Sequence, residues 1–168
     1  MKRIICVLCA ILMIGALMTA CSNSNSSENG SGGGADVSAD ASLQEIFDEI
    51  KSETGLSGLA EFTSVDRLDR KYGITEEMVD EFAGGADASS ISMCEIVLVK
   101  AADADSAAEI EKKLNNRLDS LLKQSKNYSP EQAAVIEKCK VETNGLYVSM
   151  IIAEDADKIT EIYKGHFK

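Results

Sequence analysis

Apolar positions recur at helical spacing behind three Ser-x-x-Glu or Ser-x-x-Gln sequences, each of which can form a capping box. In the last of them Pro130 takes the first helical position, where its missing N–H costs nothing. Gly55 ends the first apolar run. The predicted helices therefore begin at the boxes of Ser42, Ser106 and Ser129, with three more over 65–72, 75–83 and about 156–167.

Strand patterns lie in the second half of the chain. Residues 94–100 form a short segment, rich in β-branched residues and apolar at consecutive positions, which is typical of a strand buried on both faces. Residues 139–143 alternate between apolar and polar, as in an edge strand. Asn144-Gly145 can supply a type I′ turn before a returning strand over 146–153. These patterns predict one buried strand beside a hairpin.

Residues 100–112 resemble residues 152–164, and each segment follows an apolar strand and begins a helix. The similarity indicates either an internal repeat or chance agreement between low-complexity segments. Two strand–helix units with a hairpin between them are parts of a ferredoxin-like fold, here without its last strand. The fold class we predict is therefore α+β: a small antiparallel three-stranded sheet of order 1-3-2 with helices, preceded by N-terminal helices.

The first 21 residues have the pattern of a lipoprotein signal. Lys2 and Arg3 precede about 15 apolar residues, fewer than the ~20 of a transmembrane helix, and the segment that follows is polar. Met18-Thr19-Ala20-Cys21 resembles a bacterial lipobox, whose cysteine is lipidated and becomes the first residue after cleavage. An ordinary signal peptide with an incidental Cys21 is the alternative. We expect lipidation at Cys21 to hold the protein on the extracytoplasmic face of the cell membrane.

Composition divides the chain into three parts. Residues 1–20 form the predicted signal peptide, which cleavage removes. Residues 21–41 are the lipidated cysteine and a Ser-, Gly- and Asn-rich tether, expected to be disordered and to reach roughly 25 Å. Residues 42–168 are long enough for a single domain.

Charge excludes two kinds of partner. The chain has 17 basic and 28 acidic residues, and removal of Lys2 and Arg3 leaves 15 basic against 28 acidic residues, a net charge of −13. An anionic membrane surface would repel this domain, so membrane attachment must come from Cys21. No basic cluster interleaved with aromatic residues is present, and we expect no nucleic-acid partner.

Two cysteines, Cys94 and Cys139, remain with the domain. Such a pair in an exported protein suggests a disulfide. In the predicted sheet, however, their strands are separated by two strand spacings, about 10 Å, which exceeds the ~7 Å limit between Cα atoms of a disulfide. We therefore predict two reduced, largely buried thiols.

Candidates for catalysis or metal binding are weak. The single histidine, His166, lies two residues from the C-terminus, where fraying is expected. Acidic residues after two strands suggest calcium, but they are more simply helix caps, and the predicted sheet places them at opposite ends. We predict no catalytic, cofactor-binding or metal-binding residue. The acids in question are Asp103 and Asp105 in one group, and Glu154, Asp155 and Asp157 in the other.

Two further segments have simple interpretations. Residues 84–90, GGADASS, are predicted to be a loop between the small helices and the buried strand. The acids before this loop are predicted to form a solvated helix face. They are Glu76, Glu77, Asp80 and Glu81.

Four segments together resemble the domain-of-unknown-function 4358 family, small lipoproteins of Gram-positive anaerobes. They are KYGI at 71–74, EIVLV at 95–99, NYSPEQ at 127–132 and NGLYV at 144–148. The similarity spans residues 60–167, and its most specific part is the Tyr-x-Pro-Glu-Gln sequence. The resemblance implies a Gram-positive cell surface, and it implies no catalytic residues.

We therefore expect a membrane-anchored extracytoplasmic lipoprotein that acts as a non-catalytic binding or assembly module at the cell envelope, with an unidentified envelope protein as partner. The alternative is a carboxylate-dependent envelope enzyme acting on cell-wall polymers, which requires paired carboxylates about 5–10 Å apart in a cleft. A solute-binding lipoprotein is disfavoured, because about 125 folded residues make one domain and not two lobes.

Overall fold

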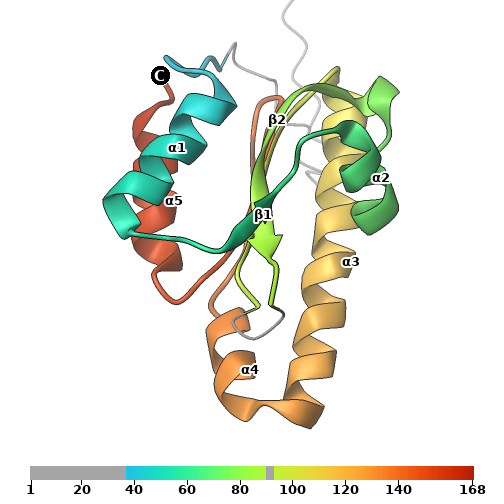
Figure 1. Ribbon diagram of the computed structural model, residues 1–168. Helices are drawn as coiled ribbons and strands as arrows, with labels where there is room; N and C mark the ends of the chain where they lie inside the picture. Colours follow the sequence, from blue (N-terminus) through green and yellow to red (C-terminus); the bar gives the residue numbers. More distant parts are fainter. Residues whose placement is uncertain (1–36, 90–92) are drawn as a thin grey trace, which may run out of the picture. The chain divides into compact units, whose positions relative to one another are not determined.

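The fold is α+β, as predicted, and is built on one antiparallel sheet (Figure 1). A computed structural model describes residues 37–89 and 93–168, which belong to one unit, Gly33–Lys168. The helices are α1 (Leu43–Thr54), α2 (Val65–Tyr72), the 3-10 turn η1 (Glu76–Met78), α3 (Ala104–Tyr128), α4 (Pro130–Ile136) and α5 (Ala156–Gly165). The strands are β1 (Leu59–Glu61), β2 (Val79–Asp87), β3 (Glu95–Ala101), β4 (Val141–Asn144) and β5 (Tyr147–Ile152).

The described strands form a sheet of order β1-β2-β3-β5-β4, with every neighbouring pair antiparallel. The three predicted strands are β3, β4 and β5, and they lie in the predicted order, with β4 at the edge. The prediction of a three-stranded sheet is nevertheless wrong, because β1 and β2 extend the sheet on the other side of β3.

Strand β2 replaces both a predicted helix and a predicted loop. Only η1 is helical within the predicted helix 75–83, and residues 79–87 pair with β3. Gly84 has φ +135°, and a Cβ at this position would collide with the carbonyl oxygen of Ile96 on β3. The Gly84-Gly85 pair therefore permits close strand pairing, although glycine normally weakens a strand pattern.

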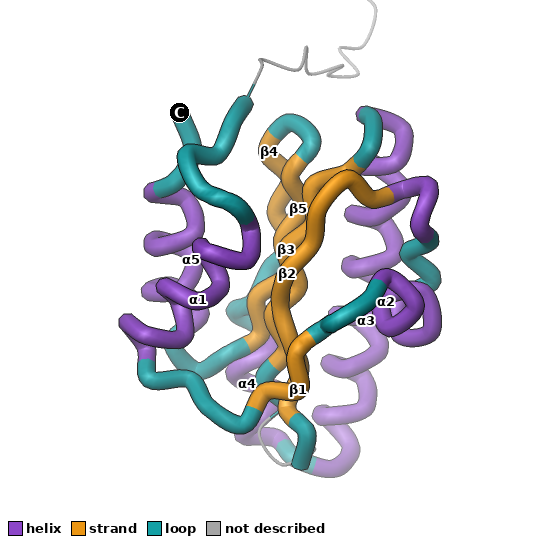
Figure 2. The backbone as a smooth tube through the Cα atoms, turned by 45° about the horizontal axis from the view of Figure 1, so that its top comes forward, coloured by secondary structure: helices purple, strands orange, loops and turns teal. Residues whose placement is uncertain are grey.

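Helices cover both faces of the sheet, with α1 and α5 on one side and α2 and α3 on the other (Figure 2). Alternate residues of β3 enter the two cores: Val97 and Val99 face α3, and Ile96 and Leu98 face α1. All four are fully buried, which confirms that this strand is buried on both faces. Helix α4 lies at the end of the sheet opposite the C-terminus (Figure 1).

The capping predictions are confirmed at α1 and wrong at α3. Ser42 accepts a hydrogen bond from the Glu45 amide, and the Glu45 carboxylate accepts one from the Ser42 amide. Glu81 also accepts from the Leu43 amide at 2.6 Å, so this acid caps α1 and is not merely a solvated side chain. Helix α3 begins at Ala104 rather than at the Ser106 box, because Asp103 caps it by accepting from the Ser106 amide.

Two other local predictions need correction. Ser129 precedes α4 with Pro130 at the first turn, but its side chain makes no capping hydrogen bond. The β4–β5 turn consists of Gly145 and Leu146, with φ +60° at Gly145 only, which fits a type II′ rather than a type I′ turn. No helix within the described residues is both long and apolar enough to span a membrane.

Candidate functional site

At one end of the sheet, the first described residues contact the C-terminal segment. We call this part of the molecule the closed end, and it contains Asp40, Tyr147, His166 and Phe167. Ala39 forms a β-bridge with Phe167, and the Asp40 amide donates to the His166 carbonyl at 2.9 Å. The structured contacts thus begin before the predicted domain start at residue 42. The C-terminal segment is paired, so the predicted fraying of His166 is wrong.

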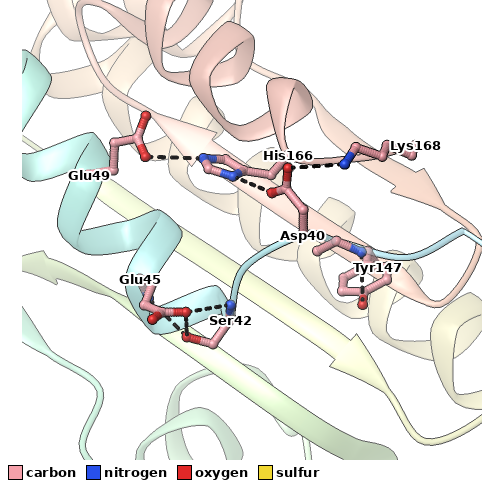
Figure 3. Close-up of polar contacts among 8 residues, drawn as sticks. Asp40, Ser42, Glu45, Glu49, Tyr147, His166 and Lys168 are labelled. Carbon is pink, nitrogen blue, oxygen red and sulfur yellow. Dashed lines mark hydrogen bonds and ion pairs between the residues drawn. The ribbon is translucent and has the colours of Figure 1, made fainter.

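The imidazole of His166 lies between two carboxylates at this end (Figure 3). Its Nδ1 is 2.8 Å from Asp40 and its Nε2 is 3.3 Å from Glu49 on α1, and the side chain is only 18% exposed. The hydrogen bond to His166 holds the pKa of Asp40 below its ordinary value. These contacts join the first described residues, α1 and the C-terminus, and they leave no ring nitrogen open for proton transfer to a substrate.

Aromatic rings complete the closed end. The Phe167 ring contacts those of Tyr147 and Tyr163 edge-to-face, each at a centroid distance of 4.8 Å. The Tyr147 hydroxyl also accepts a hydrogen bond from the Ala39 amide at 3.4 Å. Such aromatic pairs stabilise a fold beyond their buried area. We therefore assign these aromatic contacts a structural role. A hollow of about 500 Å³ lies beside them, lined by Tyr147, Tyr163 and Phe167 among others, so this end is joined by contacts but not filled.

The opposite end of the sheet contains three hollows, and we call it the hollow end: Met93, Cys94, Ala153 and Glu154. The first hollow, about 350 Å³, lies between α4 and the end of β5. The second, about 160 Å³, lies beside the start of β3, and the third, about 280 Å³, lies by α1 and α5. Met93 lines the first two, Cys94 the last two, and Ala153 and Glu154 the first and third.

The corner between α3 and α4 forms one wall of the first hollow. The residue before a proline is pushed out of the helical conformation, and Ser129 has φ −152° and ψ 89°. Helix α3 therefore ends at Tyr128, and α4 turns back with Gln132 and Val135 facing the hollow. Tyr128 is 84% exposed, the only large hydrophobic residue so exposed within the described part of the chain.

Met93 combines backbone strain with a buried polar contact. Its φ of +50° is the only positive value at a non-glycine position among the described residues. Its Sδ accepts a hydrogen bond at 3.2 Å from Ser125, a fully buried serine of α3. Strained residues persist where surrounding contacts fix them, and they are frequent at functional sites.

A buried ion cluster adjoins the second hollow. Glu95 is 4% exposed, and its two carboxylate oxygens accept from Arg117 at 3.0 and 2.8 Å, while Lys71 lies 2.9 Å away. Burial raises the pKa of Glu95, but the Arg117 and Lys71 bonds and charges outweigh it and lower the pKa below its ordinary value. Sequence reasoning missed this cluster, although one glutamate in an otherwise apolar strand signals a buried partner.

The two cysteines are buried thiols and not a disulfide, as predicted. Burial raises the pKa of Cys94 to about 11, with a smaller contribution from nearby Asp87. Burial likewise raises the pKa of Cys139. Because the thiolate is the nucleophile, both are poorly suited to nucleophilic chemistry near neutral pH.

The acidic groups considered as calcium sites lie at opposite ends of the sheet, because β3 and β5 are antiparallel. The carboxylate of Asp103 caps α3, as expected, whereas Asp155 precedes α5 without a side-chain capping hydrogen bond, so the capping expectation is wrong there. Within residues 37–89 and 93–168, no group of three or more His, Cys, Asp or Glu side chains could hold a metal ion. The predicted lipidation site, Cys21, lies outside the described residues.

Comparison with known proteins gives a family assignment. No curated protein and no solved structure is significantly similar to the chain. One family model, Domain of unknown function (DUF4358), matches residues 52–153, more than half of the chain. The match begins within α1, ends just after β5, and includes the α3–α4 corner and most of the hollow end. The chain therefore belongs to the DUF4358 family.

Proposed function

We propose that this protein is an extracytoplasmic lipoprotein, anchored in the cell membrane through Cys21, whose domain is a non-catalytic binding or assembly module of the cell envelope. The anchor is inferred from the basic start, the short apolar run and the lipobox-like Met18-Thr19-Ala20-Cys21. The lipid on Cys21, rather than the acidic surface, then holds the protein to the membrane.

The observation that carries the binding role is the separation of the closed end from the hollow end. Strand β5 runs from Tyr147 at the closed end to Ile152 at the hollow end. A strand of six residues spans about 17–20 Å. The tether would join the domain at Val37, beside the C-terminus, so the anchor would leave the hollow end accessible to a partner.

Catalysis by carboxylates receives little support from the described residues. The buried Glu95 is the strongest candidate for acid–base chemistry, but Arg117 and Lys71 occupy its oxygens and keep it ionised. A general acid needs a raised pKa, and a general base needs an available oxygen. The cluster therefore fits a structural role in holding α2 and α3 against β3.

Replacement of Cys21 tests the anchor. We expect Cys21→Ala to abolish incorporation of a labelled fatty acid and to move the protein from the membrane fraction to the medium, or to leave it as an uncleaved precursor. Cys139→Ala is the matched control, because it removes another cysteine and should leave labelling and fractionation unchanged. A Cys21→Ala protein that is still processed, lipid-labelled and membrane-bound would contradict the proposal.

A further inference from the structure

We propose that the hollow end binds a basic segment of a partner protein. An apolar side chain of that segment enters the hollow between α4 and β5, and its Lys or Arg side chains lie against Glu131 and Glu154. The inference rests on the proposed function and adds the chemistry of the partner.

The lining of the first hollow favours an apolar group at its centre. Val135, Ile136 and Ile152 line it with Met93 and Ala153, together with four polar residues: Ser129, Glu131, Gln132 and Glu154. Its volume of about 350 Å³ exceeds that of a single side chain. Because it opens to solvent beside exposed residues, an entering aliphatic or aromatic side chain would lose contact with water there.

The charge around the hollow favours a cationic partner. Glu131 and Glu154 line the first hollow, Glu154 and Asp155 line the third, and all three residues are exposed. None of them takes part in an ion pair within the part of the chain that the structure describes. No Lys or Arg of residues 37–89 and 93–168 lines either hollow.

The two cations at the second hollow are already engaged. Lys71 and Arg117 are both bound to Glu95. Since the processed chain has a net charge of −13, its long-range field also attracts a basic partner and repels an acidic one.

Two side chains suit a protein partner: Met93 lines the first hollow, and Tyr128 directly precedes Ser129 of its lining. Exposed Tyr128 offers a flat aromatic surface, and tyrosine is enriched at the centres of protein interfaces. Its ring can also contact a Lys or Arg side chain through a cation–π interaction. Met93 adds a flexible thioether, which adapts to irregular ligand surfaces.

The test uses a fluorescent reporter at the hollow end. The chain contains no tryptophan, so Tyr128→Trp places a single one next in the chain to Ser129, which lines the first hollow. The processed, lipidated protein carrying this change is titrated in non-ionic detergent with three acetylated, amidated peptides: KLLK, KSSK and ELLE. We expect a saturable blue shift with KLLK, at least tenfold weaker binding of KSSK, and no binding of ELLE.

Charge-matched variants locate the binding. Glu131→Gln combined with Glu154→Gln should weaken KLLK binding about tenfold, from two partly exposed ion pairs. The control is Glu76→Gln combined with Glu77→Gln, which removes the same charge from exposed positions of η1 and should retain at least half of the affinity. Since every protein is in the same detergent, peptide uptake by micelles cancels in this comparison.

Three results would overturn the inference. The first is equal binding of KSSK and KLLK, which would indicate simple charge attraction. The others are binding of ELLE and an equal loss of KLLK affinity in both double variants. The Cys21 experiment is independent of this titration. Failure to bind KLLK while Cys21-dependent anchoring persists rejects the basic partner and leaves the lipoprotein proposal standing.

Discussion

The two ends of the sheet differ although β5 connects them. At the closed end, Phe167 contacts two tyrosine rings and His166 lies between two carboxylates. At the hollow end, Met93 is strained and three hollows remain. Of the acids that line the first and third hollows, Glu131, Glu154 and Asp155 make no ion pair among the described residues. Each end has a hollow, of about 500 Å³ beside Phe167 and about 350 Å³ beside α4, so the difference lies in the contacts around them. The contacts between the first described residues and the C-terminus stabilise the closed end, whereas exposed acids without ion pairs surround the first and third hollows of the other end.

Matched leucine truncations should show the largest difference between the ends. Leu43, near the closed end, is fully buried, and Leu43→Ala should lower the free energy of unfolding by about 2–5 kcal/mol because it leaves a cavity. Leu56 is half-buried and lines an existing hollow, so Leu56→Ala should cost about 1 kcal/mol or less. Urea unfolding measures both, and equal losses would remove the contrast in packing.

The ion cluster of Glu95, Arg117 and Lys71 is a buried polar contact at the hollow end. Glu95→Gln should lower the free energy of unfolding by about 2–3 kcal/mol at pH 7. This loss is smaller than that expected for a fully buried ion pair, because Arg117 and Lys71 are each about 30% exposed. Glu109→Gln, at an exposed pair with Lys113, is the control and should cost less than about 0.5 kcal/mol.

The pH dependence of the same variant tests the assigned charge state. In the folded protein, the pKa of Glu95 lies below its ordinary value of 4.5. Its stabilisation is therefore fully present above pH 4.5 and disappears as the pH falls through the folded value. The difference in free energy of unfolding between the original protein and Glu95→Gln should shrink from pH 7 to pH 3. If this difference grows instead, Glu95 is buried in its neutral form.

His166→Gln should have a smaller effect at the closed end, about 1 kcal/mol, from loss of one side-chain bond. The substitution removes the contacts of Nδ1 with Asp40 and of Nε2 with Glu49. Hydrogen exchange of the Asp40 amide, which donates to the His166 carbonyl, should become faster. Lys168 is 79% exposed and its Nζ lies 3.7 Å from Asp40, so Lys168→Gln should change neither the free energy of unfolding nor the exchange rate of the Asp40 amide.

Tyr128→Ala should have the smallest effect on stability, less than about 0.5 kcal/mol, because the side chain is 84% exposed. Its effect should appear in binding instead, as weaker association with the basic KLLK peptide. Isothermal titration calorimetry and thermal unfolding separate the two quantities. A large loss of stability would mean that Tyr128 supports the α3–α4 corner and is not available to a partner.

The sequence identified those parts of the fold that have regular local patterns. The apolar run of β3, the hairpin after it and the capping box at Ser42 were all predictable, because each signal lies within a few residues. Strand β2 was missed because Gly84-Gly85 lowers strand propensity. Glycine is needed at position 84 because the backbone of Ile96 lies so close, and this contact exists only in the folded structure.

The hollow end could not be predicted because it is assembled from distant segments. Met93 precedes β3, Gln132 belongs to α4, and Glu154 follows β5. The sequence did give one indication, since the Tyr-x-Pro-Glu-Gln sequence that supports the family resemblance forms this corner. His166 was misjudged for the opposite reason: proximity to the C-terminus suggested fraying, while its partner Asp40 lies 126 residues away.

Site-specific photo-crosslinking in cells tests the central claim most directly, that the domain is anchored at the closed end and binds at the hollow end. A photoreactive phenylalanine analogue replaces Tyr128 at the hollow end or, as the control, Lys168 at the closed end, and both positions are exposed. We expect a discrete adduct with a basic protein from position 128, lost in the Glu131→Gln/Glu154→Gln background, and none from position 168. The same adduct from position 168, with none from position 128, would contradict the account.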